Sequence, residues 1–501
     1  MTNSPRRLPN AENSMATVAN GYLGTIVYSE NLYLNGFYNG RGLNSHRAKI
    51  PSPCNVRVSL PVLQCEEIYR LDVKEAVFYH QISTPDYAIE QRIYAHQLYP
   101  QLLVCDIIIQ KNHKYANEII VSVQDNFTPE SSDLEVNFSS DSSVSSMYGK
   151  ILAPESDTSG YLDVFIFWNQ FPKLLILQPN EERKSWFSII SVSQIKSKAL
   201  ESYKLGTEMT KADELFNSHI ASWETKWKSG NIDLDGDVYL SKAIHASMYY
   251  ILSSLPPIMS EEFPFYGLSP GSLATGGRSH DDDYHGHVFW DMEIWMYPPI
   301  LAFHPSLARK MLLYRVQCLD EAKNKARRHG YRGAMFPWES AYSGIEVCPG
   351  AVYANNEQHI TGDIAWAVQQ YLYVTRDVSF LTNDGGWELI YNIAVFWESR
   401  VDYDDSIDKY VINSVMPPDE YHHCIDNSVY TNVIATISLM LPYFAAKLMK
   451  NKVTVPEQWR HIADNIYIPF DEKNKYHPEF DGYTKGKKTV NLQKIVIQCL
   501  Q

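Results

Sequence analysis

The sequence lacks the features that mark secreted, membrane-spanning and nucleic-acid-binding proteins. Its first residues, MTNSPRRLPNAENSMATV, hold two arginines but no apolar stretch behind them, so no secretory signal is expected. A run of about 18 apolar residues is missing, so no membrane span is expected either. Basic residues are outnumbered, at 44 Lys and Arg against 58 Asp and Glu. The resulting net charge of −14 argues against a nucleic-acid partner and favours a neutral or cationic substrate.

Paired cysteines are missing as well. The seven cysteines are scattered and form no CxxC or CxxxC motif. This pattern predicts reduced thiols in a cytoplasmic protein rather than a disulfide framework. No repeat of fixed period and no low-complexity tract interrupts the chain, and its 501 residues predict two or three domains.

Aromatic residues, in contrast, are abundant. They make up 13% of the chain and include 34 Tyr and 11 Trp. Aromatic rings with a polar edge suit carbohydrate, because they stack on the C–H faces of a sugar and donate hydrogen bonds at their rim. Ordinary core packing accounts for the same composition, so the aromatic content alone decides nothing.

The pattern of apolar residues changes from β to helical along the chain. Residues 1–195 contain short runs near period two, such as LLVCDIIIQ (102–110) and SWFSIISVS (185–193), and they predict an antiparallel β-sandwich. Residues 196–230 predict a polar linker helix or helix pair. Residues 231–501 predict a helical domain, with helices expected at Tyr239–Leu255, Pro305–His329, Ile364–Thr375, Trp387–Val401, Asn432–Met449 and Gln458–Tyr467. Long loops at 264–287, 329–358 and 403–429 separate them, and loops of this length are usually functional or disordered.

Three segments combine aromatic and acidic residues. HGHVFWDMEIWMYPPIL (285–301) places Trp290 and Asp291 at the mouth of a predicted helix, and GYRGAMFPWESAYSG (330–344) places Trp338 beside Glu339. In MPPDEYHHCIDNSVYTN (416–432), two prolines stiffen the approach to Glu420. A glycosidase needs such a carboxylic acid, with a raised pKa, to protonate the leaving oxygen. A favourable helix-start charge or a solvated loop carboxylate explains each segment at least as well on its own.

The segment SHDDDYHGH (279–287) raises a metal-binding alternative. Imidazole and carboxylate groups of this kind ligate metals, but short Asp/His runs in loops are more often solvated surface, and no second cluster at matching spacing occurs. We therefore expect no metal and no other cofactor. The residues that this alternative would use are His280, Asp281, Asp282, Asp283, His285 and His287.

Taken together, the strings HVFWDMEIWMYP, GYRGAMFPWES and PPDEYHHCIDNSVYTN resemble the three main motifs of glycoside hydrolase family 65. The resemblance covers roughly residues 15 to 484. It implies a β-sandwich, a helical linker and an (α/α)6 barrel, which agrees with the β-then-α order of the sequence. FPWESAYSGIEVCPG and the approach to HVFWD are most similar to members that act on glucosyl-galactosyl-hydroxylysine.

The resemblance also implies roles for individual residues. Glu420 corresponds to the general acid of the family, and Trp290 and Asp291 to its glucose-binding pair. Trp338, Glu339 and His359 fall where family members line the glucose subsite. It implies release of glucose from the α-glucosyl-(1→2)-galactosyl unit by inversion, with carbohydrate as the partner.

The end of the chain departs from the family pattern. Where a Lys-Gln-Ala-Asp segment is expected after HPEFDGYTKG, the chain reads KKTVNLQKIVIQCLQ, which puts Val490 and Asn491 at the Lys-Gln positions. The catalytic base of family hydrolases lies further on. The expectation is therefore a barrel that is incomplete in this chain and a much reduced turnover.

Three other functions stay open at this point. A disaccharide phosphorylase of the same family would use phosphate in place of activated water. An inactive product would bind sugar without turning it over. A metal-dependent hydrolase would use the residues around His285.

Overall fold

The computed structural model describes residue 8 and residues 15–60, 65–112, 117–140, 144–210, 214–257, 265–277 and 283–485. Internal contacts divide the chain into two compact units. The first comprises the residues up to Arg41 together with Ser45–Gly286, and the second comprises Gly42–Asn44 and the residues from His287 onward.

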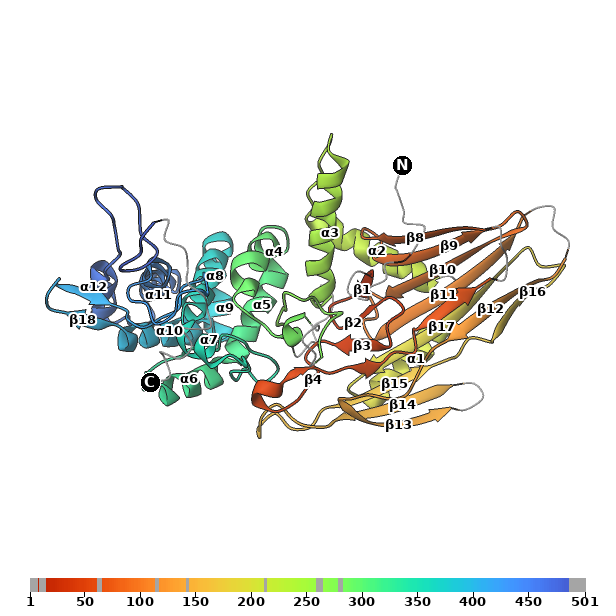
Figure 1. Cartoon of the computed structure of the whole chain (residues 1–501), viewed down its shortest axis with the longest axis horizontal. Helices are drawn as coiled ribbons and strands as arrows, with labels where there is room; N and C mark the ends of the chain where they lie inside the picture. The colour runs from red at the N-terminus through yellow and green to blue at the C-terminus, as the bar shows by residue number, and fades with distance from the viewer. Residues whose placement is uncertain are drawn as a thin grey trace. The chain divides into compact units, whose positions relative to one another are not determined.

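The first unit is an antiparallel β-sandwich, as the strand pattern predicts (Figure 1). Its large sheet has the strand order β13-β14-β15-β17-β11-β10-β9-β8, and smaller sheets have the orders β1-β2-β3-β6 and β16-β12-β7. The strands are β1 (Thr17–Ala19), β2 (Leu23–Ile26), β3 (Asn31–Leu34), β4 (Tyr38–Asn39), β5 (His46–Arg47), β6 (Ile50–Pro51), β7 (Val56–Ser59), β8 (Glu66–Asp72), β9 (Val77–Ser83), β10 (Tyr87–Ala95), β11 (Leu102–Lys111), β12 (Ile119–Asp125), β13 (Leu134–Ser140), β14 (Ser145–Ile151), β15 (Asp163–Trp168), β16 (Leu174–Leu177) and β17 (Arg183–Ser193).

Strand β11 shows why the centre of the large sheet is apolar on both faces. Leu103 lies in the core shared with the smaller sheets, whereas its neighbours Leu102 and Val104 pack with Tyr203 of the helical linker. Successive side chains of a strand point to opposite faces, so a strand covered on both sides reads as one apolar run. The buried Asp106 of this strand is held by two hydrogen bonds from Arg92, at 2.7 and 2.9 Å.

The linker is a helix pair, α1 (Lys196–Met209) and α2 (Glu214–Ser229), and α3 (Val238–Ser254) follows it. Helix α1 packs on β15, β11 and β17. Side chains of α2 reach the sandwich, because the Trp227 indole donates to the Lys74 carbonyl at 3.0 Å and His219 lies 2.9 Å from the Glu75 carbonyl.

The second unit is helical, as the sequence predicts. Helix α8 packs on α5, α10 and α11, and α12 packs on α11. Its elements are η5 (Met292–Met296), α4 (Tyr297–Phe303), α5 (Pro305–Gln317), α6 (Leu319–Arg328), α7 (Ala351–Asn356), α8 (Ile360–Thr375), α9 (Val378–Asn383), α10 (Gly386–Arg400), β18 (Asp402–Asp404), β19 (Lys409–Val411), α11 (Val429–Leu448) and α12 (Glu457–Asn465).

The expected helices form, with one correction. The segment expected as a single helix from Pro305 to His329 is two helices that meet at Cys318. The expected loop at 329–358 contains α7, and the expected loop at 403–429 begins with the β18–β19 hairpin.

Helix α11 is long and apolar enough to cross a membrane by length and composition alone. However, 56% of its most apolar window is buried inside the protein, and it packs against α8, α10 and α12. These contacts are those of a core helix. A core helix can be as long and as apolar as a membrane span.

Candidate active site

The first two aromatic and acidic segments lie side by side in the helical unit. Val288 and Ser340 exchange backbone hydrogen bonds of 2.8 and 3.0 Å. This antiparallel bridge joins the chain just before Trp290 to the chain just after Glu339. Trp290 and Trp338 consequently approach each other, with 6.4 Å between their ring centroids and 30° between their planes.

A π-helical turn follows Trp290 and Asp291 directly. Met292–Met296 form η5, and its buried Glu293 accepts two hydrogen bonds from Arg315 of α5, at 2.8 and 2.9 Å. Arg315 also donates to the Phe289 carbonyl at 3.1 Å. Single π-turns inside helices occur often at functional sites. Arg315 therefore binds the chain on both sides of Asp291, at Phe289 and at Glu293.

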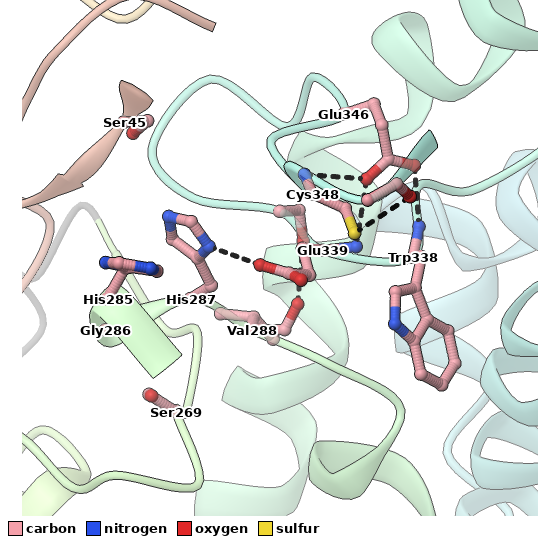
Figure 2. Close-up of polar contacts among 12 residues, drawn as sticks. Ser45, Ser269, His285, Gly286, His287, Val288, Trp338, Glu339, Glu346 and Cys348 are labelled. Carbon is pink, nitrogen blue, oxygen red and sulfur yellow. Dashed lines mark hydrogen bonds and ion pairs between the residues drawn. The ribbon is translucent and has the colours of Figure 1, made fainter. Parts of the chain in front are cut away.

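The carboxylate of Glu346 braces the second segment (Figure 2). It accepts backbone hydrogen bonds from Trp338 at 2.8 Å, from Glu339 at 3.1 Å and from Cys348 at 3.2 Å. The buried Lys325 of α6 binds the same carboxylate at 2.5 Å. A carboxylate that accepts several backbone N–H groups orders a loop strongly, since such charge-assisted bonds are among the stronger ones.

Glu339 lies below the surface, 8% exposed. One of its carboxyl oxygens is 2.6 Å from Nδ1 of His287, as Figure 2 shows. The pKa of the Cys348 thiol is raised by burial and then by the neighbouring Glu339. Glu339 is thus held on one side by an imidazole and on the other by a thiol, which fixes the direction of its carboxyl group.

The third segment is tied to the others through the ends of α7 and α10. Met416 donates from its backbone to the Asn356 carbonyl at 3.0 Å, and Val415 pairs with Ile425 across the loop. Arg400 binds Gln358 at 2.7 Å and also donates to the Asn413 carbonyl.

Glu420 lies at the tip of that loop with a left-handed backbone, φ 57°. Its amide donates to the Pro417 carbonyl at 3.3 Å. Non-glycine residues rarely adopt this conformation, and they are found disproportionately at active sites.

His359 is the centre of an aromatic cluster. Its fully buried ring lies 4.9 Å from Trp290, 5.4 Å from Trp338 and 5.2 Å from Tyr430, in each case edge to face. His359 therefore lies behind the two indoles and supports them. This close grouping brings the predicted residues Trp290, Trp338 and His359 together.

Two carboxylates hold His359. Asp363 lies 2.7 Å from Nδ1, and Glu357 lies 3.2 Å from Nε2. Burial by itself lowers the pKa of His359, but Asp363 and Glu357 outweigh it and raise the pKa to about 9. Burial raises the pKa of Glu357 to about 7, with His359 acting in the opposite direction. Tyr430 donates to the other oxygen of Asp363 at 2.7 Å.

Glu420 lies within the electric field of this cluster. Although the residue as a whole is exposed, desolvation of its carboxyl raises the pKa, the charge of Asp291 raises it further, and His359 opposes the rise. Desolvation also raises the pKa of Asp291. Carboxyl groups with raised pKa values beside flat aromatic faces can bind a neutral polyol and donate a proton to it.

Some predicted residues lie outside the described part of the chain. This holds for His280, Asp281 and Asp282 of the metal-binding alternative and for Val490 and Asn491 of the carboxyl-terminal segment. Within the described residues, no three His, Cys, Asp or Glu side chains are grouped so as to hold a metal ion.

Sequence reasoning missed Glu346, Glu357 and Asp363. None of these three residues stands beside a tryptophan or after a pair of prolines, the two patterns that mark the predicted residues in the sequence. Asp363 follows His359 by four residues, a spacing that puts both side chains on one face of a helix, and this spacing could have identified the pair.

Comparison with known proteins gives consistent relatives. Residues 275–497 match the glycosyl hydrolase family 65 central catalytic domain. Over 493 residues the chain is 39% identical to protein-glucosylgalactosylhydroxylysine glucosidase of Gallus gallus, an alignment that covers 98% of this chain and 70% of that protein. It is 34% identical to kojibiose phosphorylase of Thermoanaerobacter brockii over 304 residues, which are 56% of this chain and 38% of that protein.

A solved structure, a putative kojibiose phosphorylase from human microbiome, has the same fold. It superposes with a TM-score of 0.74 at 16% sequence identity, over 93% of this chain and 69% of that one. At this identity the likeness concerns the fold alone. It extends through both the sandwich and the helical unit.

Proposed function

Because the chain belongs to glycosyl hydrolase family 65, we propose that it hydrolyses the α-glucosyl-(1→2)-galactose bond of glucosyl-galactosyl-hydroxylysine. The chain is a glycosidase. The glucosidases that act on this disaccharide align over nearly the whole chain, whereas the kojibiose phosphorylase aligns over little more than half of it. The acidic balance of the protein also suits a substrate that carries the hydroxylysine ammonium group.

One observation carries the assignment of the general acid. The pKa of the Glu420 carboxyl is raised by desolvation and then by the charge of Asp291, the neighbour of Trp290 in the chain. A general acid needs this property, because it must hold its proton until the glycosidic oxygen takes it. Glu420 is therefore the proposed general acid.

The proposed glucose subsite uses Trp290 and Asp291, with Trp338, Glu339 and His359 around them. The indoles provide apolar faces for the sugar ring, and Asp291 accepts its hydroxyl groups. His359 is fully buried, so we propose that it acts on the subsite through the two indoles that it supports.

The reaction follows an inverting course. Glu420 donates its proton to the galactosyl oxygen as the bond to glucose C1 breaks. A water molecule adds to C1 from the opposite face and gives its proton to a second carboxylate, at a separation from the acid of about 6.5–9.5 Å in enzymes of this type. Glucose leaves as the β anomer, and galactosyl-hydroxylysine keeps the proton from Glu420.

The remaining expectations from sequence are part of the proposal. These are an (α/α)6 arrangement of the helices, a division at 1–195, 196–230 and 231–501, a cytoplasmic location, and activity without a metal or organic cofactor. Carbohydrate is the proposed partner, and neither nucleic acid nor membrane is required.

The test measures release of glucose from glucosyl-galactosyl-hydroxylysine by the 501-residue chain and by any longer product of the same gene. We expect Glu420→Gln to reduce kcat by about 10²–10⁴-fold, the usual contribution of a general acid. Glu457→Gln at the exposed start of α12 is the matched control and should keep full activity. Undiminished turnover by Glu420→Gln would remove Glu420 from its role.

Two further measurements separate the alternatives within the family. Glucose 1-phosphate that forms only when phosphate is present would identify a phosphorylase. Glucose binding in a calorimeter, together with no turnover by any product of the gene, would identify a sugar-binding protein without activity.

A further inference from the structure

The hydrogen bonds of His359 define its charge. Each ring nitrogen faces a carboxylate oxygen, with Nδ1 2.7 Å from Asp363 and Nε2 3.2 Å from Glu357. Ionised carboxylates only accept hydrogen bonds, and a neutral imidazole has a single N–H to donate. Two such bonds therefore require the doubly protonated imidazolium, unless Glu357 itself carries the proton. Either way a proton is held between Glu357 and His359.

The two carboxylates are not equivalent. Asp363 is fully satisfied, because its second oxygen accepts from the Tyr430 hydroxyl at 2.7 Å. The second oxygen of Glu357, Oε1, is buried and has no hydrogen-bond partner, and the residue is 2% exposed. A buried carboxylate oxygen without a donor is rare in proteins and costly as an anion. Glu357 is consequently the carboxyl of the pair that more readily takes up a proton.

The same group of charges acts on Glu420. Glu420 raises the pKa of Glu357, and the charge of His359 lowers the pKa of Glu420. Asp291, Asp419 and Glu339 act on Glu420 in the opposite direction. Among the groups that act most strongly on Glu420, His359 is therefore the positive one.

Titratable groups on the neighbouring elements η5, α11 and α7 also lie near this cluster. The balance of charge at Glu420 nevertheless depends on Glu357 and His359. On the η5 side, Glu293 faces Asp363, but its charge is paired with Arg315 of α5 at 2.8 Å. On the α11 side, Tyr430 donates to Asp363, and the pKa of the Tyr430 hydroxyl is raised first by burial and then by the charge of Asp363. On the α7 side, the pKa of Tyr353 is raised first by burial and then by the charges of Glu420 and Glu357.

We propose that His359 is a buried cation held at both ring nitrogens, and that Glu357 is the positioning residue that holds this cation against Trp290 and Trp338, where its charge acts on Glu420. The proposal rests on the proposed function, because it takes Glu420 as the general acid. Neither Glu357 nor His359 needs to touch the sugar for this role.

The first test is the pH dependence of kcat for three variants. In Glu357→Gln a negative charge near Glu420 is lost while Asp363 still holds the His359 cation, so the alkaline limb should move to lower pH by about 0.5–1 unit. In His359→Gln the cation is lost, and the limb should move to higher pH. Glu346→Gln is the control, since Glu346 braces the Trp338 loop and should lower kcat equally at every pH. Limbs that stay in place in both of the first two variants, or that move in the same direction, would overturn the proposal.

The second test needs neither activity nor a variant that turns over substrate. Nitrogen-15 chemical shifts of the histidine rings report whether each ring nitrogen is protonated. The signal of His359, assigned by its absence from His359→Gln, should show two protonated nitrogens in the parent protein up to about pH 8 and a lower titration midpoint in Glu357→Gln. A neutral ring at pH 7 in the parent protein would refute the buried cation. Since this readout does not involve Glu420, it stays decisive even if Glu420→Gln keeps its activity and the proposed function fails.

Discussion

At the residue scale, Glu420 joins two properties that a loop carboxylate seldom has together. Its backbone adopts the left-handed conformation, which costs a non-glycine residue about 1–2 kcal/mol. Its carboxyl has a raised pKa, caused first by desolvation and then by Asp291. The Val415–Ile425 bridge and the bond from Met416 to Asn356 hold the loop and offset that strain. These contacts thus hold Glu420 in place despite its strained backbone.

Asp291→Asn tests the electrostatic part of this account. The amide keeps the shape of the side chain but removes the charge that raises the pKa of Glu420. A general acid works only while protonated, so a lower pKa makes it lose its proton at lower pH. We expect the alkaline limb of kcat to move to lower pH. We also expect KM to rise, because the proposed hydrogen bonds from the sugar hydroxyls to Asp291 are weakened. Asp464→Asn, on the exposed face of α12, is the control. A limb at its original pH would show that Asp291 acts on the sugar alone.

Residues were predictable from the sequence where chemistry and neighbours in the chain coincide. Trp290 with Asp291, Trp338 with Glu339, and Glu420 after two prolines are predicted in this way, and their roles stay predictions. Glu346 and Glu357 could not be found so, because their roles come from hydrogen bonds to segments that meet only in the folded chain. His359 was predicted to line the sugar subsite, and its complete burial behind the indoles could not be read from its position in the sequence.

At the element scale, the helices were predictable from their apolar period and their breaks were not. Cys318 interrupts the expected helix with φ −82° and ψ −1°, which is a small departure from helical geometry. Leu319, Ala322 and Ala326 after the break are therefore still buried, as a continuous apolar period predicts. Gly344 of the following loop packs closely against this break. A Cβ atom on Gly344 would lie 2.8 Å from the Cβ of Cys318. Helix α7 has only six residues, too few for a period to show.

The ion pair Glu293–Arg315 is the strongest candidate for an interaction that supports the site by fixing a whole element, the turn η5. It joins η5 to α5, and both side chains are at most 1% exposed. Arg315→Ala leaves a buried carboxylate without its partner, a change that typically costs about 3–5 kcal/mol. We expect a loss of this size in the free energy of unfolding, measured with urea for the helical unit.

The matched control is Arg332→Ala, which breaks an ion pair with Glu398 at 3.2 Å where the arginine is 68% exposed. Exposed pairs contribute about 0–1 kcal/mol, so this variant should stay near the parent. Equal losses in the two variants would mean that burial of the Glu293–Arg315 pair has no special effect.

At the scale of the whole molecule, each unit contains a buried histidine whose pKa is shifted, and the two shifts have opposite directions. In the sandwich, Nδ1 of His96 accepts backbone hydrogen bonds from Leu98 at 3.1 Å and Tyr99 at 3.0 Å, so it has no place for a proton. Burial lowers the pKa of His96 to about 4, whereas that of His359 in the helical unit is raised. Acid and alkali therefore act first on different units.

The sign follows from proton binding. The folded sandwich holds no proton on His96 above about pH 4, whereas the unfolded chain binds one below about pH 6.5, so stability is complete above 6.5 and is lost as the pH falls towards 4. For a shift of this size the loss between pH 7.5 and pH 5 is about 2 kcal/mol.

His96→Asn keeps an acceptor for the two backbone N–H groups but cannot bind the proton. We expect it to be less stable than the parent at pH 7.5, since the contact to the Leu215 carbonyl at 2.8 Å is weakened, and to lose about 2 kcal/mol less on acidification. Urea unfolding followed by hydrogen exchange in peptides from β10 and α2 measures both effects, with His461→Asn on the exposed face of α12 as the control. If the parent and His96→Asn lose equal stability on acidification, then another group of the sandwich takes up the proton.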